Sequence, residues 1–392
     1  IRQGKQRPQL SCLYQVALRR SPRELLEIVR ESGLRGCGGA GFPVARKWEA
    51  MAAARGDRKV VVCNADESEP GTFKDRTLLD LQPRRVLAGL CLAAATVGAQ
   101  RAVIYVRHAY DRQYRRLGDE IDGAIRDGLL APDLEVVLRR GAGLYVCGEE
   151  TALLNSLEGR RPVTRERPPY PTTAGLLGLP TLIHNVETLA ALPAIVARGA
   201  GWYRAAGRPK LYCVSGDVGR QGVLELPMTT RVRELLSYTG CDLQRVKAFT
   251  LGGLSGGLLP ARLAEVVLDY EGPAAHGAHL GSGAVIVLSQ RRCLLRFVLQ
   301  GARFFARESC GRCFPCRIGT ERLCERLDAA SKGAPVDHVE LRNLLSVIGA
   351  GSACGLGGAA ATIVGHLLEH FGEKLHGHAG GGCEAIGCEE QA

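Results

Sequence analysis

The sequence has few aromatic residues, little lysine and no long hydrophobic run. Aromatic residues make up 5% of the 392 positions, and only 8 of the 51 basic residues are lysine. The longest apolar stretches, such as residues 86–97, fall well short of the roughly 20 residues that span a bilayer. No basic segment followed by an apolar one opens the chain, so a secretory signal is not expected. These absences predict a cytoplasmic protein without direct membrane insertion.

The net charge of +11 comes from arginines that are scattered along the chain. Nucleic-acid-binding proteins usually gather basic residues on one face or arm, and many stack bases on aromatic rings. The sequence shows neither pattern, so we expect no nucleic-acid partner. Hydrophobic residues make up 46% and charged residues 23%, which is typical of globular domains, and the length predicts two or three of them.

Helices and strands alternate in the first half of the chain. Strands are expected at residues 59–63, 102–107 and 134–138, with helices at 84–97 and 111–128 between them. This alternation predicts a Rossmann-like α/β domain whose parallel sheet is covered by helices. Ligands of such sheets bind at the carboxyl ends of the strands. Two unusual loops, NADESEPG and GAGLYVCGEE, follow strands here and are therefore candidate ligand loops.

The second half of the chain changes character twice. Residues 208–290 hold short apolar strands separated by glycine and proline, with one helix, which suggests a ubiquitin-like (β-grasp) module. Helical patterns return at residues 292–307, 317–330, 338–348 and 357–372 and predict a small helical bundle. The expected organisation is an α/β domain over 1–205, a ubiquitin-like domain over 206–290, a helical domain over 291–376 and a flexible tail over 377–392.

Fifteen cysteines, an odd number without a secretory signal, argue against a disulfide framework. Cys310, Cys313 and Cys316 recur at every third residue, and [4Fe–4S] clusters are often held by three cysteines at this spacing and one from afar. Cys354, in a glycine-rich break between helices, suits a fourth ligand better than Cys324, which falls in mid-helix. Zinc is the alternative metal, but its sites usually pair two C-x2-C elements, and this chain has no second one.

The segment Gly36–Gly41 contains the pattern G-x-G-x-x-G. The dinucleotide-binding fingerprint needs a strand before these glycines, whereas a helix is expected here, so the fingerprint fails in context. Consecutive glycines still expose backbone N–H groups and let a flat or phosphorylated ligand come close. Lys47 follows as a candidate phosphate partner.

Acidic side chains crowd both candidate ligand loops. Asp66, Glu67 and Glu69 lie within four positions, and Glu149 and Glu150 open an expected helix. Carboxylates packed this densely repel one another, so we expect them to meet hydroxyl, amide or cationic groups of a ligand. Capping of the helix N-terminus, where the dipole favours negative charge, explains one of the two helix glutamates equally well.

Two further patterns are weaker. Residues 366–370 match the H-x-x-E-H signature of a metalloprotease group, but the sequence offers no evident third ligand, so we expect these histidines on an ordinary helix face. Cys383 and Cys388 stand five positions apart near the end of the chain and are a weak candidate for metal or redox use.

Five ordered motifs resemble one protein family: SGLRGCGGAGFP, CNADESEPGTFKDR, YVCGEETALLNSLEG, HNVETLA and ESCGRCFPCRIG. They are similar to the 51 kDa-type flavoprotein subunit of respiratory complex I, which oxidises NADH. Soluble relatives of that subunit are the diaphorase subunits of NAD-reducing hydrogenases and the β subunits of NAD-dependent formate dehydrogenases. The resemblance runs from about Ser32 to Ala361 and implies FMN, NAD(H) and one [4Fe–4S] cluster as cofactors.

The resemblance also implies site residues. Positions that match FMN contacts are Gly36, Gly38, Gly39, Lys47, Asn64, Asp66, Tyr145, Gly148, Asn185 and Thr188. Positions that match the surroundings of the nicotinamide nucleotide are Phe42, Glu67, Glu69, Glu149, Glu150 and Tyr170, of which Glu69, Glu149 and Glu150 are the expected catalytic-site residues. The cluster ligands match Cys310, Cys313, Cys316 and Cys354. The chain departs from the family at Cys37, Ala50, Ser68 and His184, where arginine, an aromatic residue, glycine and asparagine are common.

The implied reaction is hydride transfer between NAD(H) and FMN, followed by one-electron transfer to the cluster, within a multi-subunit complex. The implied partners are a thioredoxin-like [2Fe–2S] subunit and a larger iron–sulfur or molybdenum/tungsten catalytic subunit. The phrase ETALLNSLEG and the ending CRIG favour a soluble formate dehydrogenase or hydrogenase complex over complex I, where the chain would lie peripherally at the cytoplasmic face of the membrane. The departures at Cys37, Ser68 and His184 leave open one alternative, an electron-wiring subunit that keeps the cluster but has lost flavin turnover. A structural metal-binding protein is a third possibility.

Overall fold

The computed structural model describes residues 20–130, 133–376, 378 and 383. The chain divides into two compact units, one holding the residues up to Ser68 together with Phe73–Leu211, the other holding Glu69–Thr72 together with the residues from Tyr212 onward. The expectations for the first 19 residues, for Cys388 and for most of the tail over 377–392 lie outside the described residues.

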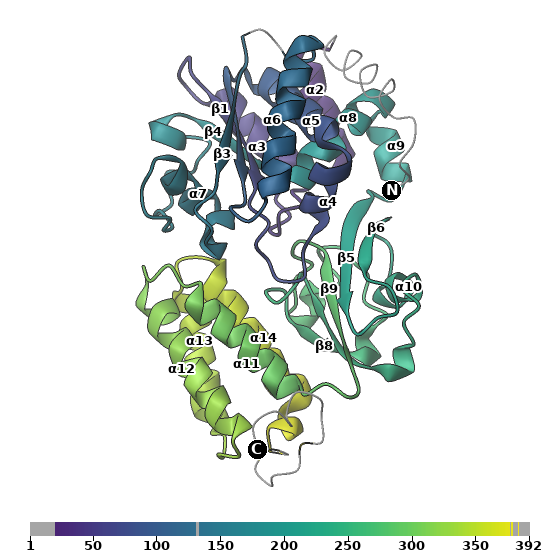
Figure 1. Ribbon diagram of the computed structural model, residues 1–392, viewed down its shortest axis with the longest axis vertical. Helices are drawn as coiled ribbons and strands as arrows, with labels where there is room; N and C mark the ends of the chain where they lie inside the picture. The colour runs from purple at the N-terminus through teal and green to yellow at the C-terminus, as the bar shows by residue number, and fades with distance from the viewer. Residues whose placement is uncertain (1–19, 131–132, 377, 379–382, 384–392) are drawn as a thin grey trace. The chain divides into compact units, whose positions relative to one another are not determined.

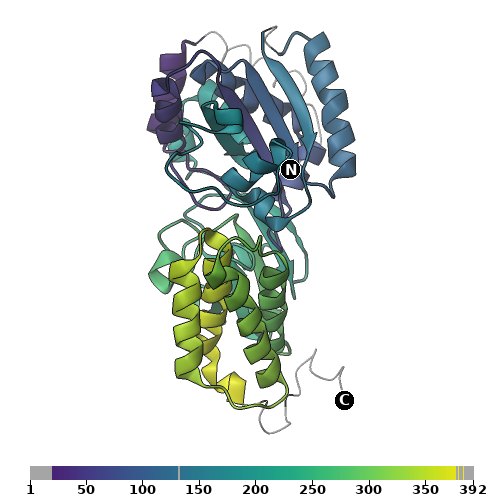
Figure 2. The same ribbon diagram turned by 90° about the vertical axis from the view of Figure 1, so that its left-hand side faces the viewer.

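The first unit is an α/β domain (Figures 1 and 2). Its elements are α2 Pro22–Ser32, α3 Val44–Ala53, β1 Val60–Ala65, α4 Lys74–Leu81, α5 Pro83–Val97, β2 Arg101–Val106, α6 Asp111–Arg126, β3 Glu135–Arg140, the 3-10 turn η1 Tyr145–Gly148, α7 Glu150–Leu157, η2 Leu176–Gly178, β4 Thr181–Asn185, α8 Val186–Arg198 and α9 Ala200–Ala205. The strands and helices predicted for this half recur within a few residues. The helices α4, α8 and α9 and the strand β4 were not predicted from the sequence.

The sheet of the first unit has four parallel strands in the order β3-β2-β1-β4. The predicted Rossmann-like α/β architecture is therefore confirmed for this unit. The register between β1 and β4 aligns Asn64 with Asn185. Two residues that the family resemblance marks as ligand positions thus lie side by side at the carboxyl edge of the sheet, where parallel sheets bind their ligands.

Apolar side chains cover both faces of this sheet, because successive strand residues point in opposite directions. One face carries Val60, Val62 and Val103, which share a buried cluster with Leu153 and Leu154 of α7. Helices α5 and α8 lie against the other face (Figure 1).

Helices α5 and α8 approach each other closely. A Cβ added at Gly89 of α5 would lie 1.9 Å from the backbone oxygen of Leu189 in α8. Only glycine permits this approach, and the close packing fixes the position of α8, whose N-terminus reaches the carboxyl edge of the sheet.

The helix that is expected before the glycine loop is present as α2, and local signals mark both of its ends. The Ser21 hydroxyl accepts a hydrogen bond from the Glu24 N–H (3.3 Å), and the Glu24 carboxylate accepts one from the Ser21 N–H (2.7 Å), which together form a capping box. Gly33 ends α2 in the left-handed conformation, with φ +66°. A helix therefore leads into the glycine loop, in place of the strand that a dinucleotide fingerprint needs.

The second unit contains a mixed sheet and a helical bundle (Figures 1 and 2). Its elements, of which β5 begins in the last residues of the first unit, are β5 Lys210–Gly216, β6 Gly222–Leu226, α10 Val232–Ser237, η3 Leu243–Arg245, β7 Val246–Leu251, β8 Leu258–Pro260, η4 Ala261–Leu263, η5 Ala274–His276, β9 Ala284–Ser289, α11 Leu294–Arg307, α12 Phe314–Ser331, α13 His338–Gly351 and α14 Gly355–His376.

The mixed sheet has the strand order β6-β5-β9-β7-β8. Strands β5 and β9 pair in parallel, whereas β7 pairs antiparallel with both β9 and β8. Helix α10 contributes Val232, Leu235 and Leu236 to the buried core, which also contains Phe249 and Val285 of the sheet. A mixed sheet that packs against one helix is the predicted β-grasp arrangement, with β8 as a strand that the sequence did not reveal.

Helices α11 to α14 form the predicted bundle. Helix α11 packs against α12 and α14, and α13 packs against the same two helices (Figure 2). The C-x2-C-x2-C segment leads into α12, whose N-cap is Cys313, and Cys354 lies in the break between α13 and α14. Within the described residues, no helix has both the length and the apolar character needed to cross a membrane.

Candidate functional site

Hydrogen bonds tie together the loops that follow β1 and β3. The Asn64 amide donates to the Gly148 carbonyl (3.0 Å), and the Asn64 side-chain oxygen accepts from the Asp66 N–H (3.1 Å). The Ser68 hydroxyl lies 3.2 Å from the Asp66 carboxylate and 3.3 Å from the Tyr145 carbonyl. The structure thus brings four expected ligand residues together, and Ser68 holds them where the family commonly has glycine.

The glycine loop docks onto the start of α8. The Gly36 N–H donates to the Phe42 carbonyl (2.9 Å), which closes the loop on itself. The Cys37 N–H donates to the Thr188 hydroxyl (2.8 Å). Thr188, expected as a flavin contact, therefore also anchors the loop.

Two glycines in this loop leave room for a ligand beside the sheet edge. A Cβ added at Gly38 would lie 3.2 Å from the Cβ of Asn185, and Gly39 adopts φ +138°, where an added Cβ would meet nothing within 4 Å. A side-chain-bearing residue rarely adopts such a backbone conformation. The loop therefore keeps a glycine-only conformation beside open space, as expected of a backbone that a flat, phosphorylated ligand approaches.

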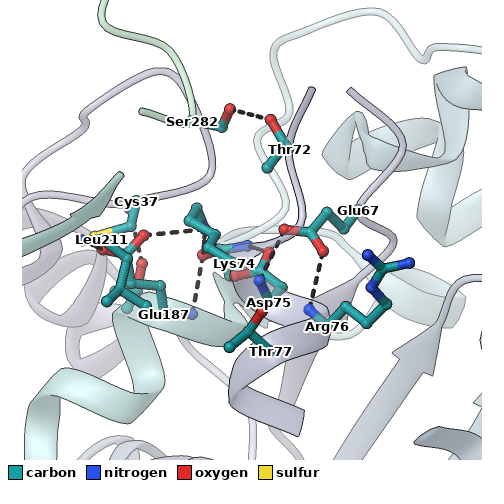
Figure 3. A network of polar contacts seen from close by, with 12 residues as sticks. Cys37, Glu67, Thr72, Lys74, Asp75, Arg76, Thr77, Glu187, Leu211 and Ser282 are labelled. Atoms are coloured by element: carbon teal, nitrogen blue, oxygen red, sulfur yellow. Dashed lines mark hydrogen bonds and ion pairs between the residues drawn. The ribbon is translucent and has the colours of Figure 1, made fainter. Parts of the chain in front are cut away.

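A buried ion-pair network supports the same edge (Figure 3). The Lys74 ammonium lies 2.7 Å from the Asp75 carboxylate, 3.0 Å from the Glu187 carboxylate and 3.1 Å from the Asn185 side-chain oxygen. Lys210 forms a second ion pair with Glu187 at 3.0 Å. The network joins the segment after β1 to the N-terminus of α8 and fixes the Asn185 side chain. Its members lie within the motifs CNADESEPGTFKDR and HNVETLA, or at the start of β5, but their pairing was not predicted.

The network keeps the Glu187 carboxylate ionised although it is buried. Burial alone would raise the pKa of Glu187, but the ammonium groups of Lys210 and Lys74 lower it below its usual value. Burial would likewise lower the pKa of Lys74, and the carboxylates of Asp75 and Glu187 raise it well above its usual value instead. Each charge thus depends on its partners, so loss of one partner leaves an uncompensated buried charge.

Glu67 points into the protein. Its carboxylate accepts hydrogen bonds from the N–H groups of Asp75 (2.8 Å) and Arg76 (2.9 Å) at the start of α4, and from the Tyr110 hydroxyl (2.9 Å). Burial and the neighbouring Asp75 carboxylate raise the pKa of Glu67 to about 7. Glu67, expected near the nucleotide, is a buried cap of α4 that positions the ligand loop.

Glu149 and Glu150 have different roles at the start of α7. The Glu149 carboxylate accepts hydrogen bonds from the N–H groups of Thr151 and Ala152, both at 2.9 Å, so capping accounts for this glutamate. Glu150 forms an ion pair with Lys47. Lys47, expected as a phosphate partner, thus reaches the carboxyl edge of the sheet and meets an acidic side chain there.

Two expected nucleotide residues carry exposed aromatic rings, and a third lies in the other unit. Phe42 is 46% exposed and Tyr170 is 58% exposed, which is unusual for large apolar side chains and suits stacking against a planar ligand. Glu69 belongs to the second unit, where its carboxylate accepts from the Ser255 N–H (3.0 Å).

Two of the residues that depart from the family pattern, Cys37 and His184, are buried in the core of the first unit. The Trp48 indole N–H donates to Nε2 of His184 (2.8 Å), and burial, reinforced by the charge of Lys47, holds the pKa of His184 well below its usual value. Cys37 is buried, and burial raises the pKa of its thiol to about 11. Both side chains are buried in the protein.

The four predicted cluster cysteines converge at one end of the bundle. Burial, followed by the nearby thiols of Cys313, Cys354 and Cys310, raises the pKa of Cys316 to about 11, against the hydrogen bond from Ser309. The groups whose charges act on Cys324 are instead Arg303, Arg307, Glu321 and Asp328. The structure therefore groups Cys354, and not Cys324, with the C-x2-C-x2-C cysteines.

The spacing of these sulfurs favours a cubane over one zinc ion. A tetrahedral zinc holds thiolates at about 2.3 Å, so its sulfurs lie within about 4 Å of one another. Among the described residues, two groups of three metal-ligating side chains have ligand atoms within 4.8 Å of one another, and neither includes a cysteine of this quartet. A [4Fe–4S] cluster is larger than one ion and needs a wider set of thiolates.

The H-x-x-E-H match on α14 has a structural explanation. Nδ1 of His366 accepts a hydrogen bond from the Leu258 N–H (3.1 Å), and the His366 ring also bonds the backbone of His276. His366 is buried and joins α14 to strand β8 of the same unit. These contacts fit the expectation of an ordinary helix-packing histidine.

Comparison with known proteins identifies both cofactor regions. The sequence matches the model of the Nuo51 FMN-binding domain over residues 29–194 and that of the NADH-ubiquinone oxidoreductase-F iron–sulfur binding region over residues 296–378. The F 2 subunit of NADH-quinone oxidoreductase in Rhizobium meliloti is 41% identical over 376 residues, which cover 91% of this chain and 89% of that protein. The F subunit of the Aquifex aeolicus enzyme is 40% identical over 380 residues, covering 91% and 86%.

Solved structures of an NAD+-reducing [NiFe]-hydrogenase share the fold. The air-oxidized form matches with a TM-score of 0.87 at 38% identity, covering 96% of this chain and 67% of the hydrogenase chain. The H2-reduced form matches with a TM-score of 0.84 at 40% identity, covering 93% of this chain and 63% of that chain. This chain thus spans somewhat less than two thirds of the latter hydrogenase chain.

These matches confirm FMN and a [4Fe–4S] cluster as cofactors and an NADH-linked oxidoreductase as the class of enzyme. They also confirm the fold that the motifs implied. The chain belongs to the family of NADH-quinone oxidoreductase F subunits, which is built from an FMN-binding domain and a [4Fe–4S] region.

Proposed function

We propose that the chain transfers a hydride between NAD(H) and FMN in its first unit and passes single electrons between FMN and the [4Fe–4S] cluster of its second unit. The observation that carries this proposal is the convergence of the flavin loops at the carboxyl edge of the parallel sheet, where Asn64 and Asn185 lie side by side. When bound, FMN exchanges a hydride with the nicotinamide, and the cubane carries one electron at a time.

The glycine loop and Lys47 hold the flavin phosphate in this proposal. Backbone N–H groups of Gly38 and Gly39 can surround an anion because no side chain covers them, while Gly36 shapes the loop by donating its own N–H to the Phe42 carbonyl. Lys47 supplies one positive charge at the same edge, and its ion pair with Glu150 keeps the ammonium there. Around this cradle, the remaining FMN positions Asn64, Asp66, Tyr145, Gly148, Asn185 and Thr188 fix the loops through the hydrogen bonds described above.

The nicotinamide nucleotide meets the exposed rings of Phe42 and Tyr170 in this proposal. Glu149 and Glu150 orient the nucleotide by charge and position, and neither needs to act as a base because the hydride moves between cofactors. Glu149 also lies 3.7 Å from the Arg167 guanidinium. Glu67 acts indirectly, as the buried cap that positions its loop, and Glu69 is assigned to the nucleotide by family resemblance alone.

The four cysteines Cys310, Cys313, Cys316 and Cys354 are the proposed cluster ligands. Hydrogen bonds reach the sulfurs of at least two of them: the Ala353 N–H points at the Cys313 sulfur (3.5 Å), and the Ser309 hydroxyl lies 3.2 Å from the Cys316 sulfur. Hydrogen bonds to cluster sulfurs raise the reduction potential by stabilising the added negative charge. These contacts support a cluster tuned for electron transfer over a purely structural metal.

The parent complex and the domain boundaries belong to the same proposal. We propose boundaries near residues 205 and 290 and a cytoplasmic complex with a thioredoxin-like [2Fe–2S] subunit. The third subunit would be a larger iron–sulfur or molybdenum/tungsten catalytic subunit, as in NAD-linked formate dehydrogenases or hydrogenases. Identification of the co-purifying subunits tests this point: a molybdopterin subunit indicates formate, a nickel–iron subunit hydrogen, and membrane subunits a quinone.

Cofactor content and NADH oxidation test the function itself. The purified full chain should contain about one FMN per cluster and reduce ferricyanide with NADH. Tyr170→Ala should raise the KM for NADH several-fold with little change in kcat, because an aromatic stacking contact is worth about 0.5–1.5 kcal/mol. Tyr238→Ala, which removes an equally exposed ring of the second unit (57%), is the matched control and should change neither constant.

A chain with full iron and sulfide but no flavin would instead support the wiring subunit. Among the described residues, the departures that motivated this alternative are absorbed internally: Ser68 bonds the ligand loops, and His184 bonds Trp48. No observation on the first unit therefore favours the wiring subunit over the flavoprotein.

A further inference from the structure

A separate group of metal-ligating side chains lies in the second unit. It consists of Cys293, the residue before α11, together with His378 and Cys383, which follow α14. One ligand atom of each residue lies within 4.8 Å of the other two, and the Cys293 sulfur is 3.4 Å from Nε2 of His378. The proposed NADH reaction and the cluster use none of these residues.

We propose that Cys293, His378 and Cys383 bind a zinc ion. Two thiolates and one imidazole form a donor set that zinc prefers, with Zn–S of about 2.3 Å and Zn–N of about 2.0–2.1 Å. Ligand atoms at these distances from one tetrahedral ion lie within about 4 Å of one another, so the observed spacing needs only a small contraction. A water molecule or one further side chain completes the four positions.

The His378 ring is held as a metal ligand usually is. One of its nitrogens faces the Cys293 sulfur, and the ring also forms a hydrogen bond with the backbone of Ser331 at the end of α12. Metal-ligating histidines commonly bond a backbone carbonyl in this way, which fixes the orientation of the ring. The contact with Ser331 therefore presents His378 to the two cysteines.

The charge around the group suits thiolate ligands. Arg296 lies one turn after Cys293 on α11, its charge acts on His378, and its Nε is buried without a hydrogen-bond partner among the described residues. A nearby guanidinium favours the thiolate over the thiol. Zinc binding releases the two thiol protons, and the two thiolates then balance the charge of the ion.

Metal analysis of the purified full chain tests the proposal. Zinc, iron and acid-labile sulfide are measured together after dialysis against EDTA, and we expect about one zinc per chain in addition to the cluster iron. X-ray absorption at the zinc edge should show about two sulfurs near 2.3 Å and at least one nitrogen near 2.0–2.1 Å. Zinc bound only by oxygen and nitrogen would contradict the proposed site.

Variants separate this site from the cluster. Cys383→Ser and His378→Gln should each lower zinc retention at least tenfold, because a three-ligand site loses one of its ligands, and should leave iron content and ferricyanide reduction by NADH unchanged. Cys383 is half-buried, so this variant avoids the packing change expected at the buried Cys293. Cys324→Ser, another half-buried cysteine of the bundle, is the control and should keep its zinc.

Three results would overturn the proposal. The first is a chain that retains no zinc, and the second is full zinc retention by Cys383→Ser. The third is a Cys293–Cys383 disulfide, found by peptide mapping of protein alkylated at purification, because a disulfide would remove both thiolates. Zinc retained in a chain without flavin would refute the proposed NADH reaction and leave the zinc site standing.

Discussion

The flavin region of the first unit and the cluster region of the second are held together in different ways. At the carboxyl edge of the first sheet, Asn64, Glu67 and Glu149 are each engaged by hydrogen bonds within the protein. At the cluster, burial and neighbouring thiols raise the pKa of Cys316, so four deprotonated sulfurs would repel one another without a metal. The protein therefore builds the first region by itself, whereas the second depends on iron to hold its ligands together.

This difference predicts how each region fails. Loss of one cluster ligand should abolish the cluster, because all four thiolates bind the same [4Fe–4S] group. Loss of one flavin-loop contact should weaken folding or FMN binding by a limited amount, because the remaining hydrogen bonds still hold the loops in place. The predictions below test this contrast from the largest expected effect to the smallest.

The largest effect is expected at the fourth cluster ligand. Cys354→Ala should abolish the EPR signal of the reduced cluster, whereas Cys324→Ala, which alters a cysteine beside Arg303 and Arg307, should leave it intact. EPR spectra of dithionite-reduced protein, together with iron counts, measure both effects. A signal that survives in Cys354→Ala and disappears in Cys324→Ala would reverse the ligand assignment.

Breaking the buried ion-pair network should destabilise the first unit. Lys74→Met leaves Asp75 and Glu187 without their shared cation, and loss of one partner of a buried ion pair costs about 3–5 kcal/mol. Both tryptophans of the chain, Trp48 and Trp202, lie in the first unit, so urea unfolding followed by tryptophan fluorescence reports on this unit.

The control for this variant is an exposed ion pair. Arg101→Met removes an ion pair of the first unit with Glu135, whose side chains are about half exposed (48% and 56%), and such pairs are worth about 0–1 kcal/mol. The cluster EPR signal should be unchanged in Lys74→Met. Equal stability of Lys74→Met and the wild type would show that the network does not stabilise the carboxyl edge of the first sheet.

The glycine loop should tolerate no side chain at Gly39. Gly39→Ala forces a Cβ onto a residue with φ +138°, and strain of this kind costs about 1–3 kcal/mol, so FMN should be lost faster on dilution. Gly118→Ala, in open space on α6, is the matched control and should keep its FMN. Flavin fluorescence in the filtrate after dilution measures the release of FMN. Equal release from both variants would show that Gly39 does not contribute to FMN binding.

The smallest effect concerns pH and His184. This histidine stays neutral in the folded protein because burial, aided by Lys47, lowers its pKa, whereas in the unfolded chain it binds a proton below about pH 6.5. Its contribution to stability is therefore complete above pH 6.5 and is lost as the pH falls, by about 1.4 kcal/mol per pH unit.

His184→Asn should remove this pH dependence. The stability difference between wild type and variant is compared at pH 7.5 and pH 5.5 by the tryptophan-monitored urea assay. The wild type should lose stability relative to the variant at the lower pH. A difference that stays constant between the two pH values would mean that His184 titrates normally in the folded protein.

Sequence periodicity predicted the elements that have strong local signals. The helix before the glycine loop and the bundle helices lie where they were expected, because apolar spacing acts over a few positions. Strand β4 was missed because it has only five residues and contains His184. Helix α8 was missed because Pro193 interrupts its pattern.

The internal role of Glu67 could not be predicted. Glu67 looks like a ligand group in the sequence, but its burial and one of its hydrogen bonds depend on Tyr110, which is 43 positions away. The capping by Glu149 is local, and the sequence had offered capping as an explanation for one of the two helix glutamates. Cys310, Cys313 and Cys316 were easier to recognise, because their spacing is a local property of the sequence.

An anaerobic NADH titration of the wild type and of Cys354→Ala tests the contrast between the two regions most directly. The wild type should take up about 1.5 equivalents of NADH, two electrons for FMN and one for the cluster, and the variant about 1.0 equivalent, with flavin bleaching preserved. Absorbance of the flavin and EPR of the cluster follow the two cofactors separately. A Cys354→Ala protein that has lost its flavin, or whose flavin NADH no longer bleaches, would contradict the claim that the first unit builds its site without the cluster.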